Sequence, residues 1–253
     1  MAPRRKDAGR RRTDVTRARV KRVVGAGFLA AALLSAALVA ASLSGSRDSS
    51  EEPTAAVAAT VGAGGVDELL RDIPQDGIAL GSPDAPVTLV EYADLQCPYC
   101  AAWALESFPE IVDQYVRPGH VRLVFRGLAF LGPDSDTALR TTLAAGAQDK
   151  LWNVLHLLYR SQGAENAGWV TDRLLGEVTG SVQGLDGDRV LAERESALVE
   201  RQLVAAQQAG AQAGIAGTPS FEAGPTGGRL QPLEIHSLDA AELGAHLDQL
   251  LAR

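Results

Sequence analysis

A strand that runs directly into a Cys-Pro-Tyr-Cys turn and a helix is the feature that most limits how this chain can fold. Residues 86–94, PVTLVEYAD, are rich in β-formers, and the residues after Cys97 repeat apolar side chains at helical spacing. Pro98 suits the first turn of that helix, and Arg-Pro-Gly at 117–119 ends it before a second strand-like run, HVRLVFRGLAF at 120–130. Strands joined in this way lie parallel with a right-handed crossover, so the sequence predicts an α/β core.

The remainder of the domain predicts a helical insertion followed by a hairpin. Residues from about 134 to 214 are rich in Ala, Gln and Glu and contain stretches with helical periodicity. Strand-like segments return on both sides of a Pro-Thr-Gly-Gly turn at 225–228, and residues 238–252, LDAAELGAHLDQLLA, form an amphipathic pattern. We therefore expect residues 66–253 to form one α/β domain with an all-helical insertion.

The N-terminus combines a basic tail with a long apolar run. Residues 1–22 contain ten Lys or Arg against two Asp, and no charged residue occurs from Val23 to Ser46. A run of this length can cross about 30 Å of hydrocarbon, and basic residues before it predict that the tail stays inside. We expect a cytoplasmic tail at 1–22, a single-pass transmembrane anchor at 23–45, a flexible linker at 46–65 and an exported main domain.

A cleaved signal peptide is the alternative for the apolar run, because Val39-Ala40-Ala41 offers small residues at a cleavage site. The run is longer than the apolar core of most signal peptides, which favours an uncleaved anchor. Both alternatives place the main domain outside the cytoplasm, at or beyond the cell membrane. The acidic balance after the basic tail argues against nucleic acid as the main partner, because phosphate binding needs a basic face on the folded domain.

The chain has two cysteines, Cys97 and Cys100, separated by Pro98 and Tyr99. At the start of a helix, the first cysteine lies beside unpaired backbone N–H groups and the positive end of the helix dipole, which favour its thiolate. We predict that Cys97 is the nucleophile and that Cys100, one turn deeper, resolves mixed disulfides. A zinc site is the weaker alternative because the four histidines lack zinc-finger spacing, and so is a static disulfide, because so short a loop constrains the unfolded chain little. We expect no metal and no cofactor.

Two acidic residues precede the cysteines. Glu91 lies six residues before Cys97 within an apolar strand, so its carboxylate is expected to point inward beneath the dithiol with a raised pKa. There it would exchange a proton with Cys100, whereas the alternative is an ordinary glutamate at a strand edge. Asp94, at the strand end, is expected to cap the helix or turn, although it too could exchange a proton.

Several other residues carry weaker signals. Pro219 follows Gly217-Thr218 and could simply begin a strand, since X–Pro bonds are cis in only about 5 to 6% of cases. The three tryptophans are expected to belong to the core rather than to a peptide groove. Arg122 and Arg126 alternate with apolar residues and are expected on a solvated face or in local ion pairs.

The stretches APVTLVEYADLQCPYC, VFRGLAF and GTPSF together resemble the DsbA-like branch of the thioredoxin superfamily, over residues 66–253. The segment SQGAENAGW at 161–169 is similar to a recurring feature of the membrane-anchored bacterial members. The resemblance implies a thioredoxin-like fold with a helical insertion. It also implies that the Thr218–Pro219 peptide is cis and faces Cys97, and that Thr218 offers its backbone to a substrate as an added strand.

The resemblance further implies a protein disulfide oxidoreductase that acts on cysteine-containing exported proteins. Oxidation is the favoured direction, with electrons passed to a DsbB-like or VKOR-like membrane partner. The best-known oxidases of the family have histidine where this chain has Tyr99, so Cys97 is expected to be a weaker thiolate and the protein a milder oxidant. The alternatives are a reductase or isomerase of the same fold, and a tethered chaperone or Cu(I)-binding module.

Overall fold

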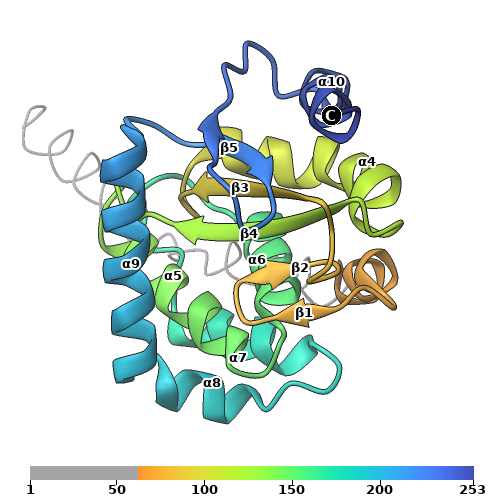
Figure 1. Ribbon diagram of the computed structural model, residues 1–253. Helices are drawn as coiled ribbons and strands as arrows, with labels where there is room; N and C mark the ends of the chain where they lie inside the picture. Colours follow the sequence, from red (N-terminus) through yellow and green to blue (C-terminus); the bar gives the residue numbers. More distant parts are fainter. Residues whose placement is uncertain (1–61) are drawn as a thin grey trace, which may run out of the picture. The chain divides into compact units, whose positions relative to one another are not determined.

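The computed structural model describes residues 62–253, in which helices pack against a six-stranded mixed sheet (Figure 1). The expected basic tail, the transmembrane anchor at 23–45 and most of the linker at 46–65 lie outside the described residues. Within the part that is described, none of the helices combines the length and the apolar character needed to span a bilayer.

The described residues begin in a helix that precedes the first strand. Residues 62–70 are helical, so the helix includes residues that the sequence assigned to the linker. Ala63, Val66 and Leu70 on this helix are buried in the main core. A segment rich in Ala and Gly becomes helical here because one of its faces packs against the core.

The sheet has the strand order β1-β2-β4-β3-β5-β6. Its centre is the parallel pair β3 and β4, as the strand–helix–strand pattern predicted, and all the other neighbours are antiparallel. The strands are β1 (Gln75–Asp76), β2 (Ala79–Leu80), β3 (Val87–Ala93), β4 (Val121–Gly127), β5 (Ser220–Pro225) and β6 (Gln231–Pro232).

The helical run that follows Cys97 alternates between α and π geometry. In its first wide turn the N–H of Phe108 bonds to the carbonyl of Trp103, five residues back. The next residue, Pro109, has no N–H to donate, and the wide turn accommodates its ring without ending the helix. The segments are α3 (Pro98–Ala102), η1 (Trp103–Ser107), α4 (Phe108–Ile111) and η2 (Val112–Val116).

The predicted helical insertion is confirmed and consists of five helices between β4 and β5. It begins with a proline at the first helical position and ends at Gly214, whose φ of 70° is the left-handed conformation typical of a helix C-terminus. Every residue of α6 from Leu151 to Tyr159 is buried, so α6 is the central helix of the insertion. The helices are α5 (Pro133–Gly146), α6 (Leu151–Arg160), α7 (Asp172–Ser181), α8 (Gly187–Glu193) and α9 (Ala197–Ala213).

The chain ends with the predicted hairpin and helix. Glu222 of β5 pairs with Pro232 of β6, and α10 (Ala240–Leu251) follows. The second arm of the hairpin has only two paired residues, which is shorter than the strand-like texture of its sequence indicated. Pro232 has no N–H to continue the ladder, which keeps β6 short at the edge of the sheet.

The two faces of β3 meet different sets of side chains. Leu89 and Ala93 belong to the large core, whereas Val90 and Tyr92 belong to a small cluster on the opposite face. Because side chains alternate along a strand, Glu91 shares the face of Leu89 and Ala93. Its carboxyl group is therefore directed into the large core.

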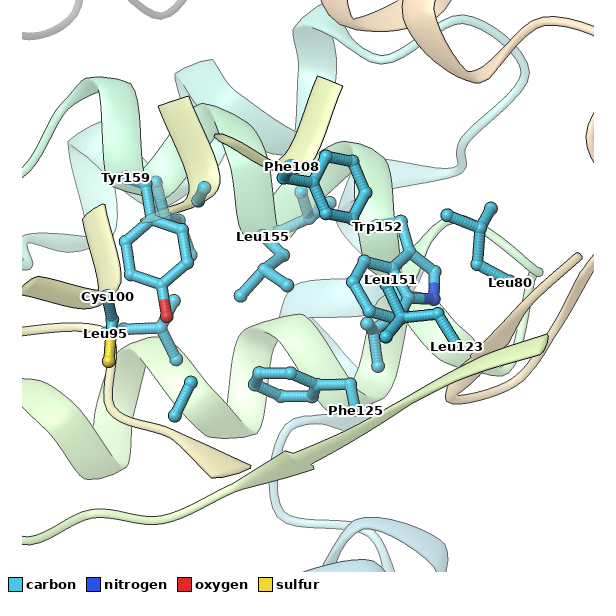
Figure 2. Packing of buried hydrophobic residues seen from close by; sticks show 14 of the residues in the cluster. Leu80, Leu95, Cys100, Phe108, Leu123, Phe125, Leu151, Trp152, Leu155 and Tyr159 are labelled. Atoms are coloured by element: carbon cyan, nitrogen blue, oxygen red, sulfur yellow. The ribbon is translucent and has the colours of Figure 1, made fainter. Parts of the chain in front are cut away.

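Trp152 of α6 connects the insertion to the rest of that core (Figure 2). Its ring stacks on Phe108 with a centroid separation of 5.6 Å, and it meets Phe125 of β4 edge to face at 6.1 Å. One side chain thus packs against the helix that begins at Pro98 and against the central sheet.

Replacing Trp152 with Ala is expected to lower the free energy of unfolding by about 3 to 5 kcal/mol, because the cavity would lie between three elements. Urea denaturation measures this change. Leu198→Ala on α9, where the side chain is 40% exposed, is the control and should change stability by less than about 0.5 kcal/mol. Equal losses in the two variants would contradict the packing of α6 as described.

Candidate active site

Cys97 and Cys100 lie where the chain leaves β3 and enters α3. Cys97 is the residue before the helix, with extended backbone angles of φ −71° and ψ 119°, and Pro98 occupies the first turn as predicted. Both cysteines are free thiols. Cys97 is 6% exposed and Cys100 is fully buried, so the sulfur of Cys97 is the more accessible of the two, as the sequence predicted.

The surroundings separate the acidities of the two thiols. The pKa of Cys97 is lowered to about 6, chiefly because the Cys100 thiol donates a hydrogen bond to its sulfur, while burial opposes the shift. The side chain of Thr218 and the backbone N–H groups of Cys100 and Tyr99 also favour the thiolate. Burial is the main cause that raises the pKa of Cys100. At neutral pH Cys97 therefore carries the negative charge and Cys100 keeps its proton.

The loop before β5 forms a second wall of the site. The Thr218–Pro219 peptide bond is cis, as the family resemblance implies. In the thiol form, Sγ of Cys97 donates to the carbonyl oxygen of Thr218 at 3.2 Å, across 121 residues of sequence. The structure therefore brings the predicted nucleophile together with both residues that were predicted to bind substrate.

Glu91 points inward, as predicted, and is only 1% exposed. Burial raises its pKa to about 8, and the neighbouring Trp103 partly offsets the shift. Within residues 62–253, neither Oε1 of Glu91 nor Nε1 of Trp103 has a hydrogen-bond partner of ordinary geometry. At neutral pH Glu91 is therefore mostly an uncharged carboxylic acid in a buried environment.

Tyr159 of α6 lies beside the buried end of the dithiol. Its side chain is buried, and its hydroxyl donates to the carbonyl of Asp94 at 3.4 Å. Figure 2 shows the Tyr159 ring and Cys100 in the same part of the core. Burial is the main cause that raises the pKa of Tyr159, and charges on Cys100 and Glu91 add to the shift. The insertion thus contributes a protonated phenol to the site.

Asp94 holds the turn between β3 and Cys97, which is the capping role that the sequence favoured. Its carboxylate accepts hydrogen bonds from the N–H groups of Gln96, Phe130 and Leu131 and from the hydroxyl of Ser135, at distances between 2.6 and 3.0 Å. These bonds join the turn to the start of the insertion. Its fully buried carboxylate is therefore occupied by structural contacts.

Two residues near the cysteines were missed by the sequence analysis. Gln96 is buried beside Cys97, and its side chain bonds to the insertion at Ser135 and Asn166. Gln162 reaches the same turn from the insertion. A glutamine in a polar loop has no pattern that identifies its partner, and the resemblance of residues 161–169 to a feature of the DsbA-like family was the signal that pointed to this segment.

The aromatic residues divide as expected. Trp103 and Trp152 are buried in the core, and Trp169 is partly buried against it. Tyr99 is 68% exposed between the cysteines and adds no charge to the site. Among the described residues, Phe130 is a further exposed aromatic close to the turn, to which its N–H is bonded through Asp94.

The two arginines of β4 lie away from the thiols. Arg122 forms an ion pair with Asp76 at 2.9 Å, which is the second of the two environments expected for it. Arg126 pairs in register with Tyr92 on the face opposite Glu91. In the described range, no three His, Cys, Asp or Glu side chains are grouped so that they could hold a metal ion. The side chains that do meet are suited to exchange between sulfur atoms.

One family model and several curated proteins match parts of this chain. A family model described as Thioredoxin matches residues 74–228. The "Probable disulfide bond formation protein D" of Bacillus anthracis is 35% identical over 99 residues, which cover 38% of this chain and 46% of that protein. The chain thus spans about half the length of the curated relatives it matches.

Solved structures share the fold. The oxidised form of BdbD from Bacillus subtilis superposes with a TM-score of 0.61 at 22% identity, covering 72% of this chain and 100% of the other. The α-DsbA1 protein of Wolbachia pipientis gives a TM-score of 0.60 at 20% identity, covering 74% of this chain and 96% of the other. At these identities the likeness concerns the fold.

The reactivity of Cys97 should titrate with its thiolate, with a midpoint near pH 6. Cys100→Ala removes the donor that contributes most to this acidity, so the midpoint should rise by about one pH unit or more. The rate of iodoacetamide modification of the reduced protein as a function of pH measures both midpoints. An unchanged midpoint in C100A would contradict the role given to the Cys100 thiol.

Glu91 should make the protein less stable as the pH rises. Its pKa is about 8 when folded against an ordinary value of 4.5, so its stabilising contribution is complete below 4.5 and is lost as the pH approaches 8. The glutamine side chain of the Glu91→Gln variant has no carboxyl group that could titrate. Between about pH 5 and 8, the free energy of unfolding of the wild type should therefore fall relative to E91Q by on the order of 1 kcal/mol per pH unit.

Urea denaturation of both proteins across this range measures the Glu91 effect. Cys97 titrates in both, and its opposite contribution cancels in the difference. If the two curves stay parallel at all pH values, Glu91 does not have the raised pKa.

Proposed function

The chain belongs to the thioredoxin family, and from this premise we propose that it is a thiol–disulfide oxidoreductase whose redox groups are Cys97 and Cys100. The observation that carries the proposal is the separation of the two acidities, with a pKa near 6 for Cys97 beside a raised pKa for Cys100. A thiolate that exists at neutral pH serves both as nucleophile and as leaving group. The relative named for disulfide bond formation supports the same activity.

In the oxidising direction the enzyme begins as the Cys97–Cys100 disulfide. A client thiolate attacks Sγ of Cys97, the bond between the cysteines breaks, and Cys100 leaves with the electron pair and takes a proton. A second client thiolate then attacks the client sulfur of this mixed disulfide, and Cys97 leaves as a thiolate. The client is oxidised by two electrons and the cysteine pair is reduced by two, while the other client proton goes to solvent.

Glu91 supplies the proton that Cys100 takes, and one of the two client protons then restores the Glu91 carboxyl. A pKa of about 8 leaves its carboxyl mostly protonated at neutral pH, which suits a donor. Charges on Cys100 and on Glu91 both raise the pKa of the Tyr159 hydroxyl, so Tyr159 lies within electrostatic range of each group.

Thr218 and Pro219 bind the client beside Cys97. The carbonyl of Thr218 is 3.2 Å from Sγ, and β5 begins two residues later, at Ser220. A client in an extended conformation that bonds to the Thr218 backbone as an added strand would have its own sulfur held against Sγ of Cys97. Backbone recognition of this kind suits many different clients.

Oxidation of cysteine-containing exported proteins is the direction assigned here. The name of the Bacillus anthracis relative refers to disulfide bond formation, which supports this direction. Tyr99 contributes no positive charge next to Cys97, so the protein is a milder oxidant than relatives with histidine at this position.

The site of action follows from the N-terminal sequence. Residues 23–45 anchor the protein in the cell membrane as a single span, with residues 1–22 in the cytoplasm and the catalytic domain on the outer side. A DsbB-like or VKOR-like quinone-linked enzyme in the same membrane takes the electrons from the reduced pair. The charge-free run and its basic flank support this arrangement.

Cys100→Ser is expected to accumulate mixed disulfides with exported proteins, because Cys97 attacks a client disulfide and no resolving thiol remains. Non-reducing gel electrophoresis of cells that secrete cysteine-containing proteins detects these adducts, and reductant releases them. Cys97→Ser is the control and should give none.

The absence of adducts with C100S under secretory load would refute the exchange mechanism and favour a tethered binding module. The direction is read from the reduction potential of the pair against glutathione. A potential near that of reducing thioredoxins would assign a reductase instead.

A further inference from the structure

The segment 161–169, named the strap here, crosses from the helical insertion to the turn that carries Cys97. We propose that Gln162 of the strap is a positioning residue that holds this turn in the conformation in which Cys97 carries a negative charge. The proposal rests on the thiol–disulfide exchange function proposed above and names a residue that tunes it. It also gives a role to a segment of the insertion to which the proposed exchange reaction assigns none.

Gln162 bonds to the backbone on both sides of Gln96. Its Nε2 donates to the carbonyl oxygen of Leu95 at 2.7 Å and to that of Cys97 at 3.2 Å. The Cys97 carbonyl also accepts the first bond of the helix, from the N–H of Ala101 at 3.1 Å. Leu95 and Cys97 are both buried, so bulk water is excluded from replacing these bonds. One amide group thus orients two peptide groups that flank the reactive sulfur.

Gln96 makes the reciprocal connection from the turn to the strap. Its Oε1 accepts from the N–H of Asn166 at 2.7 Å, and its Nε2 donates to Oγ of Ser135 at 3.0 Å. Asn166 has a φ of 55°, in the left-handed region that asparagine tolerates. The N–H of Gly168 donates to Asp134 at 2.9 Å. The strap is therefore tied to the turn and to the start of α5 by bonds in both directions.

These bonds act on Cys97 through the orientation of nearby dipoles. The N–H groups of Tyr99 and Cys100 stabilise the charged sulfur, and they belong to the helical turn that starts at the peptide held by Gln162. Donation to the carbonyl of Cys97 also withdraws negative partial charge from an oxygen close to the sulfur. Both effects favour the thiolate over the thiol.

Gln148 is a matched control for a purely structural role. Its Nε2 donates to the carbonyl of Asp186 at 3.2 Å, and its Oε1 accepts from the N–H of Asp186 at 2.9 Å. Like Gln162, it is half-buried and joins two separate segments through backbone groups. Both residues of this pair lie in the insertion, and neither is bonded to the turn of the cysteines.

The experiment compares Gln162→Met with Gln148→Met in the full chain, because methionine keeps the length of the side chain but cannot donate. Ultraviolet absorbance titration of the reduced protein measures the pKa of Cys97, and equilibration with glutathione measures the reduction potential. Q162M is expected to raise that pKa by about 0.5 to 1 unit and to make the pair more reducing. Q148M is expected to leave both values unchanged.

Gln162→Glu is a second variant, which preserves the shape of the side chain. Its carboxylate accepts but does not donate and adds a like charge near the sulfur, so the expected rise in the pKa of Cys97 is larger. The proposal would be overturned if the folded Gln162 variants had the same Cys97 pKa and the same reduction potential as the wild type. An equal shift in Q148M would overturn it as well.

Titration of the Cys97 thiolate requires no client protein. The positioning role of Gln162 and the exchange function are therefore tested independently of each other. If Q162M raises the pKa of Cys97 while C100S traps no client, the positioning role stands and the exchange function is wrong. If C100S traps clients while Q162M titrates like the wild type, the function stands and the positioning role is wrong.

Discussion

The register of β3 against β5 is the constraint on which the rest of the site depends. Tyr92 is paired with Ser220, and this pairing brings Thr218 to the end of β3, where the turn to Cys97 begins. Side chains alternate between the two faces along β3, and this alternation directs Glu91 into the large core. A slip of one residue would turn Glu91 to the opposite face and move the Thr218 carbonyl away from the sulfur. The contact between Cys97 and Thr218, across 121 residues of sequence, is therefore a product of strand pairing.

Burial at the end of this sheet affects the acidic groups in different ways. It raises the pKa of Cys100 and of Glu91, because neither has enough partners to stabilise a charge. It also opposes the thiolate of Cys97, but there the hydrogen bond from Cys100 and the surrounding donors outweigh it. One buried environment thus contains a charged sulfur, a protonated sulfur and a protonated carboxyl. That combination is what stepwise exchange of electrons and protons requires.

The helical insertion is part of the site as well as a cover for the sheet. Trp152 anchors α6 in the core between Phe108 and Phe125, and this anchoring sets the position of Tyr159 on the same helix. Gln162 follows directly after α6 and bonds to the cysteine turn. A change in the packing of the insertion would therefore reach the thiols through a continuous set of contacts.

The sequence by itself determined the α/β core, the insertion, the place of Cys97 at a helix start and the inward direction of Glu91, because each follows from local periodicity or from position at a strand or helix end. A DsbA-like resemblance added the cis peptide before Pro219. Only the tertiary structure decided that the Cys100 thiol, more than the helix end, lowers the pKa of Cys97. It also revealed Gln96, Gln162 and the helix at 62–70. The physical reason is that a polar side chain acquires its role from the donor or acceptor that folding brings within about 3 Å, and no local pattern encodes that distance.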